Sequence, residues 1–225
     1  MIADDSPVIA QPDFIEKLTY LNAKINDSLK KHNLPEIIGG NLFYEPNAKL
    51  DINFEQHCAS KRRRFTQAVN DKSTMFEIGI NGGHSSLLAL MSEPKLAVYA
   101  NDLAKPFDRY HPEIYTLVAC EVFPDRFNYV IGDCLQEVPK FVQYNAHIKF
   151  DIIHIDGAKE TYTSDIGNLT PSLLNNAIVI VDDYNIRRVK SQVDALLTDS
   201  AFRRLEAFPD HNAKYTNIML EYHNE

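Results

Sequence analysis

Short apolar segments alternate with helical segments from residue 74 onwards, and this alternation limits the fold more than any other feature. The apolar segments are residues 74–80, 95–102, 126–133, 149–156 and 176–183. Helical patterns cover residues 84–93, 112–122, 136–145, 159–174 and 187–198. Near-continuous apolar strands are buried on both faces, and strands that alternate with helices pair in parallel. The sequence therefore predicts an α/β domain built on a doubly wound, mostly parallel sheet.

Two more apolar segments, "FRRLEAF" and "YTNIMLEYH", lie near the end of the sequence with only "PDHNAK" between them. Neighbouring strands that lack a connecting helix pair in the antiparallel sense. We therefore expect a Rossmann-like sheet that carries an antiparallel C-terminal edge strand.

The first 70 residues have a different pattern. Residues 13–31 predict a helix, and residues 53–70 resume helical spacing. The first helix has apolar side chains at three- and four-residue steps, at Phe14, Leu18, Leu21, Ile25 and Leu29. This stripe is too short for a coiled coil and predicts a docking face. We expect residues 1–70 to form a tail and helical cap on a domain of residues 71–225, and a homodimer through the N-terminal helices is a further expectation.

Composition narrows the choice of partners. The chain has 225 residues and a net charge of −8, which argues against a nucleic-acid partner. The basic run "KRRR" at residues 61–64 is interpreted as a solvated helix face. No apolar run approaches the ~20 residues that span a bilayer, so no membrane partner is expected. The spacing of Cys58, Cys120 and Cys134 suits neither a disulfide framework nor a metal site, and the reducing cytoplasm is the expected compartment.

Acidic residues lie at or near the carboxyl end of every predicted strand of the parallel sheet. They are Glu77, Asp102, Asp133, Asp156, and Asp182 with Asp183. Ligands of doubly wound sheets bind beyond these strand ends. Any single acid could equally cap the following helix. The whole set favours a polar cleft along one edge of the sheet.

The segment "FEIGINGGHSS", residues 76–86, predicts a strand, a glycine turn and a helix. It lacks the lysine of a phosphate-binding loop and the G-x-G-x-x-G spacing of a dinucleotide site. Its pattern E-x-G-x-x-x-G-x-S resembles motif one of the class I methyltransferases, which bind S-adenosylmethionine (SAM). The resemblance implies SAM contacts from Asp102 to the ribose, from Asp133 and Cys134 near the adenine, from Asp156, and from the turn residues Glu77, Gly79, Asn81, Gly83 and Ser85.

The segment "IDGAKETY" and the pair Asp182–Asp183 in "VDDY" suggest a second type of chemistry. Three converging carboxylates would suit an oxygen-seeking cation, although a helix cap plus a solvated acid is the alternative. D-x-x-K followed by a strand that ends in two metal-binding side chains resembles the cation-dependent O-methyltransferases of the catechol, caffeoyl-coenzyme A and macrolide-sugar types. The resemblance implies a divalent cation on Asp156, Asp182 and Asp183, with Mg²⁺ expected and Ca²⁺ or Mn²⁺ as alternatives. It also implies that Lys159 is the catalytic base, made neutral by burial and by the adjacent cation; the alternative is a lysine on an exposed helix.

The sequence thus leads to an expected function. We expect a SAM-dependent methyltransferase that transfers a methyl group to a hydroxyl of a small molecule with help from a divalent cation. Two alternatives stay open: a metal-independent SAM methyltransferase acting on nitrogen or a macromolecule, and a non-catalytic SAM- or nucleotide-binding module. His154, inside a strand, is interpreted as a core residue.

Overall fold

A mixed β-sheet forms the centre of the molecule. The computed structural model describes residues 5–33, 42–44, 49–103, 121–205 and 216–224. Within these residues, seven strands form one sheet in the order β3-β2-β1-β4-β5-β7-β6. The strands are β1 (Thr74–Ile78), β2 (Ala97–Asp102), β3 (Phe127–Ile131), β4 (Phe150–Ile155), β5 (Leu173–Val181), β6 (Phe202–Arg204) and β7 (Ile218–Tyr222). Strands β1 to β5 pair in parallel, which confirms the predicted Rossmann-like sheet.

The two C-terminal strands form the predicted antiparallel pair at one edge of the sheet. Strand β7 lies between β5 and β6 and runs antiparallel to both, so β6 is the outermost strand. The register pairs Val181 at the end of β5 with Ile218 at the start of β7. Asn217 therefore lies beside the carboxyl end of β5, where the acids Asp182 and Asp183 follow.

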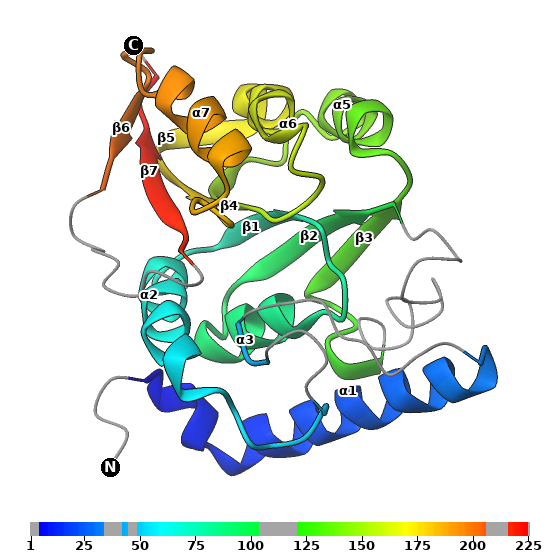
Figure 1. Cartoon of the computed structure of the whole chain (residues 1–225). Coiled ribbons are helices and arrows are strands. Elements are labelled where there is room, and N and C mark those ends of the chain that lie inside the picture. Colours follow the sequence, from blue (N-terminus) through cyan, green and yellow to red (C-terminus); the bar gives the residue numbers. More distant parts are fainter. Residues whose placement is uncertain (1–4, 34–41, 45–48, 104–120, 206–215, 225) are drawn as a thin grey trace.

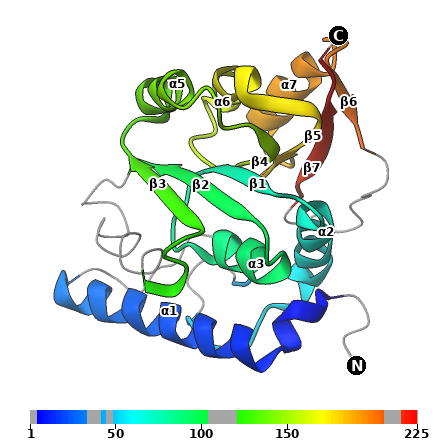
Figure 2. The same ribbon diagram turned by 180° about the vertical axis from the view of Figure 1, so that it is seen from behind.

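Helices cover both faces of the sheet, as Figures 1 and 2 show from opposite sides. One face carries α1 (Pro12–Lys31), α2 (Ala59–Val69) and α3 (His84–Ser92), and the other carries α5 (Cys134–Tyr144), α6 (Tyr162–Leu169) and α7 (Arg187–Leu196). Two buried apolar clusters match these two layers. Short 3-10 helices lie at Pro7–Ala10, Gln56–Cys58 and Thr170–Ser172.

The prediction of one helix over residues 159–174 was wrong at both ends. Helix α6 covers only Tyr162–Leu169, and β5 begins at Leu173, three residues before the predicted strand. Pro171 explains the early end, because proline cannot donate the backbone hydrogen bond that an α-helix needs at that position. The predicted helix at 112–122 falls largely outside the described residues.

The apolar stripe of α1 docks on its own domain. Its five side chains are almost completely buried, in a cluster with residues of α3 and the sheet. A cap that shares the core with the sheet accounts for this burial, but the boundary at residue 70 and the homodimer stay predictions.

The interpretation of the basic run as a solvated face was wrong. Lys61, Arg62 and Arg64 are only 3%, 1% and 4% exposed. The Arg62 Nε donates to Asp5 Oδ1 at 2.9 Å, and its Nη1 donates to the carbonyl of Leu42, also at 2.9 Å. Long basic side chains are buried where specific acceptors pair with their charges.

None of the helices in the described ranges combines the length and the apolarity that crossing a bilayer requires.

Gly79, directly after β1, lies against the backbone at the end of β4, the neighbouring strand in the sheet. Its φ is +92°, a conformation that favours glycine, and a Cβ atom there would collide with the backbone carbonyl of Asp156. The amide of Asp156 in turn donates to the carbonyl of Ile78 at 2.9 Å. Gly79 therefore allows β1 and β4 to end side by side.

We expect Gly79→Ala to lower the free energy of unfolding by about 1–3 kcal/mol or more, because it adds backbone strain and a collision. The matched control is Gly167→Ala in α6, where a Cβ meets no atom within 4 Å and the backbone is helical. That change should stabilise the fold by about 0.4–1 kcal/mol. Urea unfolding of both variants measures the difference, and equal stabilities would contradict this account of Gly79.

Candidate active site

The glycine turn between β1 and α3 forms one wall of the site. Gly83 precedes α3 with φ +78°, and Asn81 also has a positive φ of +50°. The Asn81 backbone amide donates to Asp102 Oδ2 at 2.9 Å. The structure thus brings the turn and the acid at the end of β2 together, as a shared ligand site would require.

Glu77 is the buried centre of a small network behind this turn. Its carboxylate accepts from the hydroxyls of Ser85 and Ser86 and contacts Nδ1 of His154 at 2.9 Å. Burial alone would lower the pKa of His154, but the Glu77 carboxylate, with Asp156 and Asp182 further away, raises it. Since Glu77 is fully buried, it orients the turn and His154; its direct contact with SAM stays a prediction.

Asp133, at the end of β3, caps α5. Its Oδ1 accepts from the backbone amide of Leu135 at 3.0 Å. The neighbouring Cys134 is half-buried, and burial together with Asp165 raises the pKa of its thiol to about 12. Cys134 therefore stays a neutral thiol, which suits a packing contact to a ligand and excludes a thiolate nucleophile.

Asp182 at the end of β5 forms a buried ion pair with Lys61 of α2. The Lys61 Nζ lies 2.6 Å from Asp182 Oδ1 and 2.7 Å from Oδ2. Burial would raise the pKa of Asp182, but Lys61 and His154 more than compensate and lower it. The carboxylate of Asp182 is thus held in its charged form.

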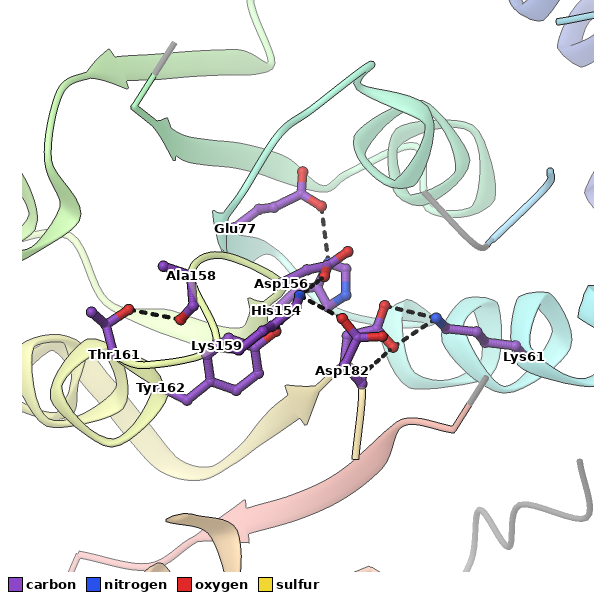
Figure 3. A network of polar contacts seen from close by, with 10 residues as sticks. Lys61, Glu77, His154, Asp156, Ala158, Lys159, Thr161, Tyr162 and Asp182 are labelled. Atoms are coloured by element: carbon purple, nitrogen blue, oxygen red, sulfur yellow. Dashed lines mark hydrogen bonds and ion pairs between the residues drawn. The ribbon is translucent and has the colours of Figure 1, made fainter. Parts of the chain in front are cut away.

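Lys159 contacts both Asp156 and Asp183, and Figure 3 shows it near Asp156 and Tyr162. Its Nζ is 3.0 Å from Asp156 Oδ1 and 2.5 Å from Asp183 Oδ2, and it donates to the Tyr162 hydroxyl at 2.8 Å. Burial would lower the pKa of Lys159, but Asp156, Tyr162 and Asp183 raise it well above its usual range. In this arrangement the two carboxylates stabilise the ammonium, and the neutral amine expected beside a bound cation stays a prediction.

The pKa of Asp156 shifts in the opposite direction from that of Asp182. Burial and the charge of Asp182 raise its pKa to about 6, despite the nearby Lys159. Two carboxylates that approach each other favour a bound positive charge. The pair of Asp156 and Asp182 therefore has the electrostatics of a cation site.

Within the described residues, His154, Asp156 and Asp182 each offer one ligand atom, and these atoms lie within 4.8 Å of one another. Two carboxylate oxygens and an imidazole fit a divalent cation such as Mg²⁺ or Mn²⁺. Asp183 is not a member of this cluster, since its carboxylate pairs with Lys159. The donor set thus fits a cation, with His154 as the third member where the resemblance implied Asp183.

A small pocket with a cavity volume of about 30 Å³ lies beside these acids. Its walls come from the segment 42–44, α2, the glycine turn and the strand ends, and include Tyr44, Lys61, Phe65, Gly79, Asn81, His84, Ser85, His154, Asp156, Asp182 and Asn217. The Asn217 amide is 2% exposed, and neither its Nδ2 nor its Oδ1 has a hydrogen-bond partner in the described structure. A buried amide without partners is costly, so this group is suited to meet a ligand.

Sequence reasoning missed Lys61 and Asn217 and set His154 aside. Lys61 follows Cys58 by three residues and precedes Phe65 by four, so the helical period already places it on the buried face. For Asn217, the pairing register of β7 supplies the position, and the sequence carries no signal for that register.

The buried His84 on the pocket wall should make the folded protein less stable as the pH is lowered. Burial lowers its pKa to about 4, while the unfolded chain titrates near 6.5, so the folded state loses stability as pH falls below 6.5. Between pH 7 and pH 5 the loss should be about 2 kcal/mol. We expect His84→Gln, which keeps a donor toward Asn22 Oδ1, to remove that part of the loss in urea unfolding. The same pH dependence in both proteins would contradict the burial of a neutral His84.

The comparisons with known proteins agree with this geometry. Residues 76–184 match the family model of a methyltransferase domain. The O-methyltransferase from Bacillus cereus, solved in complex with SAH, gives a TM-score of 0.62 at 13% identity over 95% of this chain and 92% of that chain. The O-methyltransferase TomG from Streptomyces achromogenes, involved in tomaymycin synthesis and solved with SAM, gives 0.61 at 15% identity over 93% and 90%.

Cofactor-bound Rv0187 from MTB gives a TM-score of 0.63 at 16% identity, over 93% of this chain and 91% of that chain. No curated protein sequence matches the chain significantly. At such low identities the structural matches establish the fold alone, and the family model adds a match over residues 76–184. The chain therefore has the Rossmann-like fold of these SAM-dependent methyltransferases, and its residues 76–184 are similar to a methyltransferase domain.

Proposed function

We propose that the protein is an O-methyltransferase that transfers the methyl group of SAM to a hydroxyl of a small molecule, with help from a divalent cation. One observation carries the proposal. Asp156 and Asp182, from the ends of β4 and β5, converge with His154 within 4.8 Å, beside the glycine turn. The O-methyltransferases among the structural neighbours support the same type of acceptor.

SAM, when bound, supplies an activated methyl group. We propose that the turn residues Gly79 to Ser85 hold its methionine part and that Asp102 accepts from its ribose hydroxyls. Asp133 and Cys134 would border the adenine. The hydrogen bond from the Asn81 amide to Asp102 supports this assignment, because it keeps the carboxylate next to the turn.

The divalent cation, when bound, lowers the pKa of the acceptor hydroxyl and stabilises its anion. We propose that Asp156, Asp182 and His154 hold it. Asp183 stays a candidate ligand that would first have to leave Lys159. Mg²⁺ is the proposed ion, and the imidazole ligand is equally compatible with Mn²⁺.

Lys159 is the proposed proton acceptor. Its Nζ faces Asp156 and is held in place by Tyr162 and Asp183. Since both carboxylates stabilise the ammonium, Lys159 can accept a proton only after they are engaged elsewhere. The position of the amine at the acid cluster supports the role.

The pocket supports a small acceptor. The unpartnered amide of Asn217 can both donate and accept, as a hydroxyl group requires. We propose that residues 1–70 select the acceptor, because segment 42–44 and α2 supply part of the wall. The cytoplasm remains the proposed compartment.

A second candidate function has its own observation. Lys61 already neutralises Asp182 in a buried ion pair. A lysine in this position could replace a metal, which would favour a cation-independent SAM methyltransferase. Metal dependence of turnover separates the two candidates.

Titration calorimetry with SAM tests the proposed cofactor. We expect micromolar-range binding and a loss of about tenfold or more in affinity for Asp102→Ala, because the ribose loses a charged acceptor. Asp13→Ala on the exposed end of α1 is the control and should bind SAM normally. Absence of SAM binding in the unchanged protein would remove the proposed function. SAM binding together with turnover of phenols or sugars that is the same with Mg²⁺ and with chelator would contradict only the proposed role of the cation.

Replacement of Lys159 tests the proposed base. We expect Lys159→Met to lower turnover by about 10²- to 10⁴-fold and to leave SAM affinity unchanged. Lys159→Arg keeps the positive charge near Asp156 and Asp183 but cannot act as a base, so its turnover should be equally low. Transfer of labelled methyl groups measures both. Turnover restored by arginine would assign Lys159 to charge balance instead of proton transfer.

A further inference from the structure

Lys61 contacts the acid cluster, although it lies outside the segment that matches the methyltransferase family model. It belongs to α2, whereas the matched segment covers residues 76–184. Figure 3 shows its side chain extending from α2 to Asp182, with Lys159 on the other side of that acid. The Nζ contacts both oxygens of the Asp182 carboxylate, at 2.6 Å and 2.7 Å. Lys61 and Asp182 are 3% and 2% exposed, so solvent screens this ion pair little.

The same carboxylate belongs to the candidate cation cluster with His154 and Asp156. A divalent cation on this cluster would have to share Asp182 with the ammonium or displace it. Two positive charges a few ångström apart repel strongly at a buried site. The lysine therefore opposes the cation for which the acids are arranged.

We propose that Lys61 is a built-in competitor of the divalent cation, which occupies Asp182 and weakens cation binding. Helix α2 thereby sets the cation concentration at which the site is loaded. This inference rests on the cation site of the proposed function. The competing explanation is that Lys61 only neutralises Asp182 for folding and has no influence on a cation.

Binding of Mn²⁺ provides the direct test, because electron paramagnetic resonance measures free Mn²⁺ without any need for turnover. We expect Lys61→Met to bind Mn²⁺ about tenfold more tightly or better than the unchanged protein, since one opposing charge has gone. Lys61→Gln, which is also neutral but polar, should shift in the same direction. The matched control is Lys140→Met, which removes a lysine from an exposed ion pair with Glu137 and should leave the affinity unchanged.

A double variant shows which site is responsible for the gain in Mn²⁺ affinity. Adding Asp156→Asn to Lys61→Met should abolish the added Mn²⁺ affinity, because Asp156 supplies a ligand of the same cluster. A gain that survives Asp156→Asn would come from another acidic site and would overturn the inference.

Thermal unfolding in chelator and in Mn²⁺ completes the test. The neutral variants leave Asp182 buried without its partner, so they should melt earlier in chelator and recover with Mn²⁺. Failure of both variants to fold, with or without Mn²⁺, would assign Lys61 to folding alone and overturn the inference.

Equal Mn²⁺ affinity in the unchanged protein and its variants would overturn the competition and leave the proposed function intact. No Mn²⁺ binding by any of them would overturn both the competition and the cation of the proposed function. Titration calorimetry with SAM on the same samples then shows whether the protein still binds the cofactor of the proposed function.

Discussion

The carboxylates at the carboxyl ends of β1, β4 and β5 are buried or half-buried, and each of them depends on a partner. Glu77 is satisfied by two hydroxyls and His154, Asp182 by Lys61, and Asp156 by Lys159. An unpaired charge in such a place would cost several kcal/mol. The partners come from four parts of the chain: α2, α3, β4, and the loop after β4. Folding of the N-terminal helices and assembly of the site are therefore parts of the same process.

The sheet order explains why these groups meet. Strands β2 and β4 lie on opposite sides of β1, so the direction in which strands are added reverses between β1 and β4. The connections after β1 and β4 leave the sheet to opposite faces, and a crevice opens between them. Gly79 keeps this crevice narrow at its base, since it lets the backbone of Asp156 approach. The acid of β4 and the glycine turn of β1 are neighbours for this reason.

Alternation of strands and helices was sufficient to predict the sheet, its parallel pairing and the acids at its edge, because burial on both faces leaves a direct mark on sequence. The predicted convergence of Asp156 and Asp182 also follows from this rule. Partners are harder to predict, since they depend on which helix packs over which strand end. Lys61 lies well before Asp182 in the sequence, and Asn217 reaches the site through the register of β7. The direction of the Asp183 side chain depends on a positive φ of +55°, which local sequence did not indicate.

Adjacent residues of α2 secure two distant parts of the molecule. Arg62 holds Asp5 and the carbonyl of Leu42, while Lys61 holds Asp182. A change at the N-terminal tail, such as trimming past residue 5 or fusing a purification tag, therefore acts on a helix whose next side chain touches the acid cluster. Changes near Asp5 can thus affect the acid cluster through α2. The position of a purification tag is therefore a variable in any measurement of activity.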